Sequence, residues 1–228
     1  MKTITKAIVS GFIVSILCSF LGFFGRCDSI SGKVFRLHII ANSDSAEDQS
    51  LKLKVRDRIL SDLGENFSSA ADIIEAEQLT EENLDKIESI AQDEILKNGY
   101  NCRVKVQIVH MYFNTRYYGD ITLPAGYYDA LRIVIGEGKG KNWWCVMFPP
   151  MCLPAAEGSS ELEKVLDSGE ANILDSGEKY LLEFKAVELY SEVQEFIRKF
   201  MYEPFKEIFS EIDFPYETHL TIFEFLQK

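Results

Sequence analysis

The sequence predicts an α+β protein, in which a mixed or antiparallel sheet of about four to six strands packs with helices behind an apolar N-terminal export or anchor helix. Three observations support this. Short segments alternate apolar and polar residues, as half-buried strands do. Longer segments repeat apolar residues about every four positions, as amphipathic helices do. The chain of 228 residues is long enough for one core and short for two, so we expect a single domain after the apolar segment.

The uncharged run from Ala7 to Gly25 predicts export from the cytoplasm. Lys2 and Lys6 precede the run, and a basic front followed by an apolar stretch is typical of a secretory leader. The run is also near the lower length limit for crossing a bilayer, so an uncleaved anchor is an equally good interpretation. The predicted division is 1–27 as signal peptide or membrane anchor and 28–228 as one α+β extracytoplasmic domain.

The first strand is predicted at 34–41, where apolar and polar side chains alternate. Residues that favour a helix N-terminus follow at 42–44, and a helix is predicted from 46 to 63. Gly64 is expected to end this helix. Its apolar residues fall on one face: Leu51, Val55, Ile59 and Leu63.

Two further helices are predicted, at 70–76 and at 81–96, with Thr80 capping the second. Later segments are then expected in this order: strand 101–113, strand 130–135, strand 142–148, strand 180–184, helix 186–209 interrupted at Pro204, and an ambiguous aromatic tail at 214–225. The glycine-rich loop 136–141 lacks the spacing of a phosphate-binding loop. Its simplest interpretation is a turn that joins strands 130–135 and 142–148 in a hairpin.

The formal charge of −12 argues against partners that are themselves anionic. Lys2, Lys6 and Arg26 are the only charged residues before Asp28, so the body without the leader is more acidic still. Phosphate backbones and anionic lipids would repel such a body. We therefore expect no nucleic acid partner, and a basic protein surface suits the chain better.

Residue patterns for catalysis are lacking in the sequence. The three histidines are far apart, without the short paired spacing of metal sites: His38, His110 and His219. No serine lies in a nucleophile elbow, and no cysteine–histidine signature occurs. We therefore expect no cofactor, no metal, no small-molecule substrate and no enzymatic activity. A hydrolase with paired carboxylates stays an alternative, because such pairs need no fixed spacing.

The segment 142–152 combines two adjacent tryptophans with two cysteines. Neighbouring side chains of a strand point to opposite faces, so Trp143 and Trp144 must face opposite ways. A disulfide between Cys145 and Cys152 would close a short loop and stabilise the fold by about 2–3 kcal/mol. Two reduced, buried thiols are an equally good interpretation.

Two groups of residues are candidates for binding a partner. The first lies at the end of the first predicted strand: Arg36, His38, Asn42 and Asp44. Its alternative role is structural, with the acidic and amide side chains capping the next helix. The second group combines arginine and aromatic residues, which are enriched in binding hot spots, with two asparagines. It consists of Asn114, Arg116, Tyr117, Asn142 and Trp143. For Tyr127 and Trp144 we favour a place in a second small core.

Three sequence blocks, 36–45, 114–128 and 142–152, resemble the stage II sporulation protein R family of endospore-forming bacteria. The resemblance runs in order from 34 to 152 and continues more weakly through 184–190. It implies an exported signalling protein, made in the forespore, that activates a membrane-bound protease. That protease cleaves the precursor of the mother-cell sigma factor, sigma-E.

The resemblance also implies where the protein works and with what. It would be exported across the forespore membrane, then secreted to the intermembrane space or held by its N-terminal segment. Its partner would be the extracytoplasmic face of the sigma-factor-processing protease. Two alternatives stay open: an exported hydrolase acting on cell-wall polymer or peptide, and a structural subunit of a septal assembly, which would self-associate.

Overall fold

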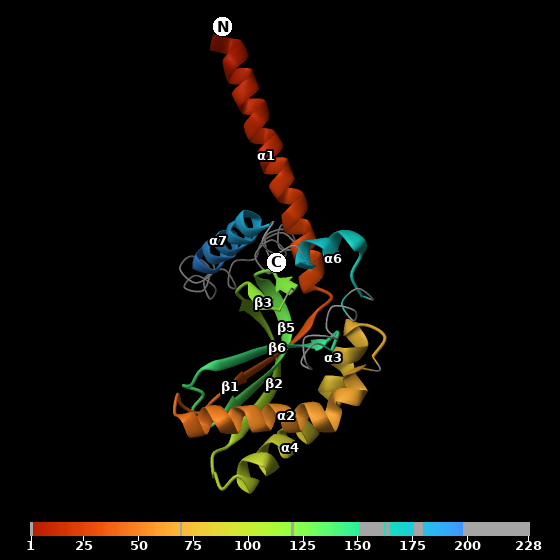
Figure 1. Ribbon diagram of the computed structural model, residues 1–228, viewed down its shortest axis with the longest axis vertical. Coiled ribbons are helices and arrows are strands. Elements are labelled where there is room, and N and C mark those ends of the chain that lie inside the picture. Colours follow the sequence, from red (N-terminus) through yellow and green to blue (C-terminus); the bar gives the residue numbers. More distant parts are fainter. Residues whose placement is uncertain are drawn as a thin grey trace, which may run out of the picture.

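The computed structural model describes residues 2–68, 70–119, 121–150, 162, 165–175 and 180–197. Pro204, the predicted tail 214–225 and Cys152 lie outside these ranges. The described elements follow one another in this order (Figure 1): α1 (Lys2–Ser31), β1 (Phe35–Ile40), α2 (Ala46–Ser68), α3 (Ile73–Glu82), α4 (Leu84–Lys97), β2 (Val104–Phe113), β3 (Arg116–Tyr118), β4 (Ile121–Leu123), β5 (Gly126–Ile135), β6 (Asn142–Phe148), α6 (Ser168–Asp175) and α7 (Leu181–Ile197).

A mixed sheet of four strands, in the order β2-β5-β1-β6, forms the centre of the protein. Strand β1 is parallel to β5 and antiparallel to β6, and β2 is antiparallel to β5. The predicted α+β class with a mixed sheet is confirmed. The predicted hairpin between 130–135 and 142–148 is wrong, because β1 lies between these two strands. A separate two-stranded hairpin is formed by β3 and β4.

The loop 136–141 carries the chain across the end of β1 instead of turning it directly back. Two of its backbone N–H groups donate to residues that follow β1, Lys139 to the carbonyl of Asn42 at 3.1 Å and Gly140 to the carbonyl of Ala41 at 2.9 Å. A Cβ atom on Gly140 would overlap the backbone carbonyl of Ser43. Only glycine therefore allows the loop to pass this close to the neighbouring backbone.

Replacing Gly140 by alanine is expected to lower the free energy of unfolding by about 3 kcal/mol, because the new methyl group meets backbone that cannot rotate away. Chemical denaturation of the full chain measures this. The matched control is Gly32→Ala, where the nearest atoms to an added Cβ are 3.7 Å away. The control should change the free energy of unfolding by less than about 0.5 kcal/mol. Equal effects at the two positions would contradict the close crossing of the loop.

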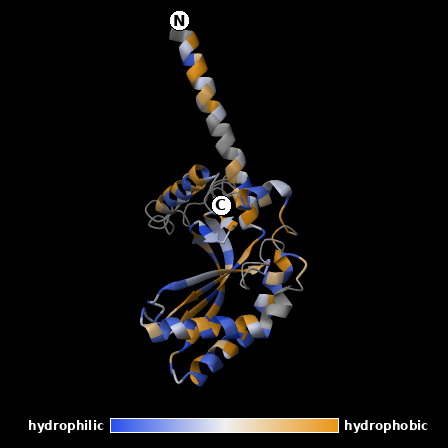
Figure 2. Cartoon of the chain, in the orientation of Figure 1, coloured by the Kyte–Doolittle hydropathy of each residue, from blue (hydrophilic) through white to orange (hydrophobic). Residues whose placement is uncertain are grey.

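One face of the sheet is covered by α2, α3 and α4 (Figure 1). Strand β1 contributes Phe35, Leu37 and Ile39 to this core, and all three are fully buried. The helices meet them with side chains spaced along one face, as α2 does with Leu51, Val55 and Ile59. In Figure 2 orange and blue alternate along α2 and α4, as expected of helices with one buried face.

The other face of the sheet packs, at one end, against the last turns of α1 and against α6 and α7. Phe23 and Cys27 of α1 are buried there, and the Phe23 ring lies 5.5 Å from that of Phe184 in α7. Both α1 residues belong to the segment predicted as leader or anchor. Removal of residues 1–27 would therefore take two buried side chains out of this core.

An ion pair fastens α6 to the end of α1. The Glu170 carboxylate is 2% exposed and accepts a hydrogen bond from Lys33 Nζ at 2.7 Å and one from Ser29 Oγ at 2.6 Å. Burial alone would raise the pKa of Glu170, but these donors together lower it below its ordinary value. The carboxylate therefore stays ionised, and the pair stabilises the junction at neutral pH.

Several predicted element boundaries are corrected by the structure. Helix α2 continues through Gly64 to Ser68. Thr80 does not cap a helix but lies buried within α3, where its Oγ1 donates to the carbonyl of Ala76 at 2.7 Å. The predicted strand 180–184 is instead the start of helix α7, because Phe184 and Val187 face the core with helical spacing.

Helix α1 is a single helix of 30 residues that extends away from the sheet (Figure 1). Within the part of the chain that the structure describes, no helix is both long enough and apolar enough to cross a membrane. The predicted export or anchor role of the N-terminal segment stays a prediction.

Candidate functional site

The second face of the sheet brings arginine, histidine and aromatic side chains together. Every second side chain of a strand lies on the same face of the sheet, and paired residues of neighbouring strands also share a face. Arg36 and His38 of β1 therefore share a face with Arg132 of β5, which is paired with His38, and with Trp144 of β6, also paired with His38. We call this surface the arginine face, and it consists of Arg36, His38, Arg116, Arg132, Asn142 and Trp144.

Arg36 is fully buried at the inner end of the arginine face. Its guanidinium lies 4.2 Å from the ring centre of Phe113 and 4.9 Å from that of Tyr128, and Nη2 donates to the Tyr118 hydroxyl at 2.5 Å. Among the described residues, Nε and Nη1 of Arg36 have no hydrogen-bond partner, and no carboxylate pairs with the group. Aromatic faces offset only part of the cost of burying such a charge. Arg36 is thus a buried positive charge without a counterion.

His38 lies beside Arg36 on β1 and is 3% exposed. Its ring stacks on Trp144 with centroids 3.8 Å apart, and Nε2 lies 2.9 Å from Oδ1 of Asn142, so Nε2 carries the proton that this contact needs. Burial lowers the pKa of His38 from 6.5 to about 4, with the hydrogen bond to Asn142 opposing the shift and the charges of Arg132 and Arg36 adding to it. His38 is therefore neutral at pH 7.

The lowered pKa of His38 makes stability depend on pH. The unfolded chain binds a proton to this histidine below about pH 6.5 and the folded chain only below about pH 4, so the free energy of unfolding should fall as the pH drops through this window. Its full contribution is about 3 kcal/mol. Denaturation at a series of pH values measures the slope, and His38→Phe should reduce it. An unchanged slope in that variant would show that His38 is not neutral in the folded protein.

Two partly exposed arginines lie on the arginine face, Arg116 near Trp144 and Arg132 near His38. Arg116, from β3, places its guanidinium 5.3 Å from the ring centre of Trp144, and Arg132 is next to His38 in the sheet. In the described part of the chain, Nε of each arginine is buried without a hydrogen-bond partner. Because both residues are partly exposed, the ends of their side chains are the parts that solvent reaches.

The other predicted partner-binding residues lie in different surroundings. Asn42 and Asp44 bind the loop 136–141. Asn42 Oδ1 accepts from the backbone N–H of Glu137 at 3.0 Å, and Asp44 Oδ1 accepts from that of Lys141 at 2.6 Å. Asn42 Nδ2 also donates to the buried Asp48 at 2.9 Å. Hydrogen bonds from Ser43 first, and then from Asn42, lower the pKa of Asp48. These contacts are structural, but they differ from the expected helix cap, because it is Ser45 Oγ that accepts from the backbone N–H of Asp48 at 3.1 Å. Contact with a partner stays a prediction.

Asn114 and Tyr117 are exposed near Arg116, and Tyr117 is 60% exposed. Trp143, in contrast, faces the helices and packs against the main core, with the Arg56 guanidinium 4.2 Å from its ring centre. The two tryptophans face opposite ways, as predicted. Trp144 packs against the second core, as expected, and is partly exposed. Trp143 was expected at the surface but is only partly exposed and packs against the main core.

Cys145 is buried and disulfide-bonded. Cys152 lies outside the described residues, so its pairing with Cys145 stays a prediction. Of the cysteines that the structure describes, Cys27 and Cys102 are free.

The sequence did not identify Arg132 as a member of this site or Phe113 as its neighbour. Arg132 occupies a polar position of a predicted strand, where a solvated side chain is the ordinary expectation. The signal that could have found it is its register with His38, and that register depends on a parallel pairing between segments about 90 residues apart, which sequence periodicity does not reveal.

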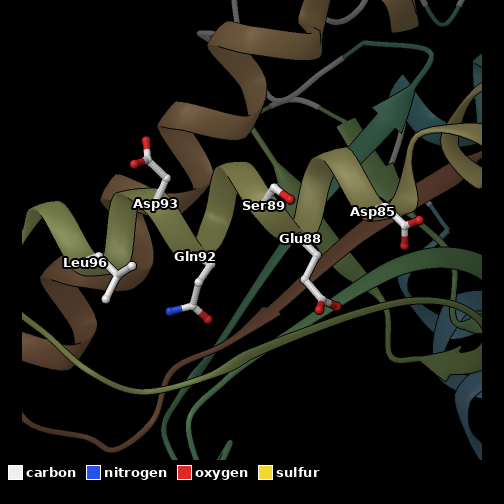
Figure 3. Close-up of a pocket in the computed structure, with 6 residues that line it drawn as sticks. All are labelled: Asp85, Glu88, Ser89, Gln92, Asp93 and Leu96. Atoms are coloured by element: carbon white, nitrogen blue, oxygen red, sulfur yellow. The ribbon is translucent and has the colours of Figure 1, made fainter.

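A second concave region lies along α4 and is lined by acidic and amide side chains (Figure 3). Two of these side chains bind the backbone of β2, an edge strand of the sheet. Gln92 Oε1 accepts from the N–H of Val104 at 3.1 Å, and Glu88 Oε2 accepts from that of Val106 at 3.2 Å. These bonds satisfy the unpaired edge of the sheet, so we assign this region a structural role.

The fold and the arginine face thus define an α+β protein with a cationic, aromatic surface on an otherwise acidic chain. A family model, stage II sporulation protein R, matches residues 31–157. This chain belongs to that family. It is also 39% identical over 123 residues to a protein of Bacillus subtilis (strain 168) named stage II sporulation protein R. The match covers 54% of this chain and 55% of the relative, about half of each. No solved structure matches the chain.

Proposed function

We propose that this chain is an exported, non-enzymatic signalling protein of sporulation. In this proposal it activates the membrane-bound protease that processes the sigma-E precursor in the mother cell. Family membership is the observation that carries the proposal, and the matched region contains the whole of the arginine face. The uncharged N-terminal run after Lys2 and Lys6 supports export.

The arginine face and the neighbouring β3 strand are the surface that we propose for docking. Tyr117, Asn114 and Asn142 are exposed there, and Arg116 and Trp144 are partly exposed. Arginine and aromatic side chains supply large contact areas with few torsions to immobilise, which suits the centre of a protein interface. Arg36 and His38 are buried, so both hold this surface in shape, and Arg36 also gives it positive charge.

Activation would come from binding alone. A ligand shifts a protein between inactive and active arrangements only by binding the active one more tightly. The proposed protein therefore needs no catalytic group of its own. It needs a rigid surface that fits one arrangement of the protease, and a sheet face held from behind by α2, α3 and α4 meets that need.

A reconstituted cleavage assay tests this function. The full chain, kept in solution with a mild detergent, is added to vesicles that contain the protease and the sigma-E precursor. Cleavage that depends on the concentration of the chain is the expected result, and the chain alone should not hydrolyse cell-wall fragments. An absence of cleavage with a protease shown to be competent, or hydrolysis of wall polymer by the chain alone, would overturn the proposal.

A further inference from the structure

The arginine face carries several cationic groups and no acidic partner for them. Its arginines come from three different strands, Arg36 from β1, Arg116 from β3 and Arg132 from β5. Among the described residues, none of the three forms an ion pair, although the chain as a whole has an acidic excess. Other described cations, such as Lys33 and Arg58, do pair with carboxylates. The arginine face therefore lacks the carboxylate partners that these other cations have.

Unsatisfied polar atoms are concentrated on the same surface. In the described part of the chain, eight buried side-chain nitrogen or oxygen atoms have no hydrogen-bond partner, and five of them belong to Arg36, His38, Arg116 and Arg132. Buried polar groups are normally paired, so a cluster of exceptions needs an explanation. Two of these residues, Arg36 and His38, are fully or almost fully buried.

We propose that the arginine face is a binding site for a carboxylate, and that its occupant is an acidic side chain on a protein segment. Guanidinium groups bind carboxylates through paired hydrogen bonds, and Arg116 and Arg132 present partly exposed guanidinium groups on this face. Trp144 is partly exposed next to Arg116 and offers apolar area for the rest of the segment. Two pockets lined by described residues lie elsewhere, along α4 and between β4 and α6.

This inference deepens the proposed function by naming what the partner must present, an aspartate or glutamate. It rests on that function only for the identity of the partner. The site itself can be tested without the protease, so a failed cleavage assay and a failed carboxylate site are separate outcomes.

The chain has only two tryptophans, which makes its indole NMR signals a direct test. The probe is an acetylated and amidated six-residue peptide with two central glutamates flanked by leucines. It is titrated into the full chain labelled with ¹⁵N, and the signals are assigned with Trp144→Phe. We expect the Trp144 signal to shift and saturate, the Trp143 signal to stay, and the same peptide with glutamines to have less than one-tenth of the effect.

Variants and a free carboxylate complete the test. Arg116→Ala with Arg132→Ala should remove the shift, whereas Lys86→Ala with Arg103→Ala, which removes two exposed cations elsewhere, should leave it intact. Acetate at the same carboxylate concentration should have less than one-tenth of the effect. The proposal would be overturned by no shift at all or by equal shifts with the glutamine peptide. It would also be overturned by a shift that survives the loss of Arg116 and Arg132, or by acetate as effective as the peptide.

Discussion

Replacing Arg116 and Arg132 together by alanine is expected to abolish activation of the protease while leaving the protein folded. Each arginine of a binding hot spot contributes about 2 kcal/mol, so the loss of both should lower the affinity for the protease more than about 100-fold. Both side chains are partly exposed and form no ion pair in the described part of the chain, so folding depends little on them. We expect the free energy of unfolding to change by less than about 1 kcal/mol.

The cleavage assay at several concentrations of each variant measures this effect, with denaturation of the same samples as the measure of stability. Lys86→Ala with Arg103→Ala is the matched control, since it removes the same charge from exposed positions away from the arginine face. If the control lost as much activity as the test variant, net charge and not the arginine face would explain activation.

Trp143→Ala is expected to have the opposite pattern, a large loss of stability with activation retained. The Trp143 ring packs against the main core on the helix side of the sheet, beneath the Arg56 guanidinium. Full truncation of a core tryptophan costs about 3–5 kcal/mol, and a partly exposed one should cost about 2–3 kcal/mol. Denaturation measures the loss, and the cleavage assay below the unfolding transition measures the activity per folded molecule.

Tyr117→Ala is the companion variant for stability. Tyr117 is 60% exposed, so its loss should change the free energy of unfolding by less than about 0.5 kcal/mol. A stable Trp143→Ala protein that failed to activate the protease would place the docking surface on the helix side of the sheet and would contradict our assignment.

Much of the local structure was predictable because periodicity depends on nearby residues. The alternation of Phe35, Leu37 and Ile39 predicted β1, and the spacing of Leu51, Val55 and Ile59 predicted α2. The strand order was not predictable. Local rules favour a hairpin between β5 and β6, but the sheet inserts β1 between them, and the glycines of loop 136–141 reveal this only once their neighbours are known.

The candidate site was predictable in part for a related reason. Residues Arg36 and His38 alternate along one strand, so the sequence alone places them on one face. Arginine is rarely buried without a partner, so the full burial of Arg36 among Phe113, Tyr118 and Tyr128 could not be expected from its position in the chain. Arg132 joins the site only through the parallel pairing of β1 with β5.

Chemical modification of its arginines tests whether the arginine face is the surface through which this protein acts. The full chain is treated with phenylglyoxal alone and with vesicles that contain the protease, and mass spectrometry gives the modification rate at each arginine. We expect slower modification of Arg116 and Arg132 in the presence of the protease, with Arg103 unchanged. Unchanged rates at Arg116 and Arg132 under conditions in which the protease is activated would contradict this expectation.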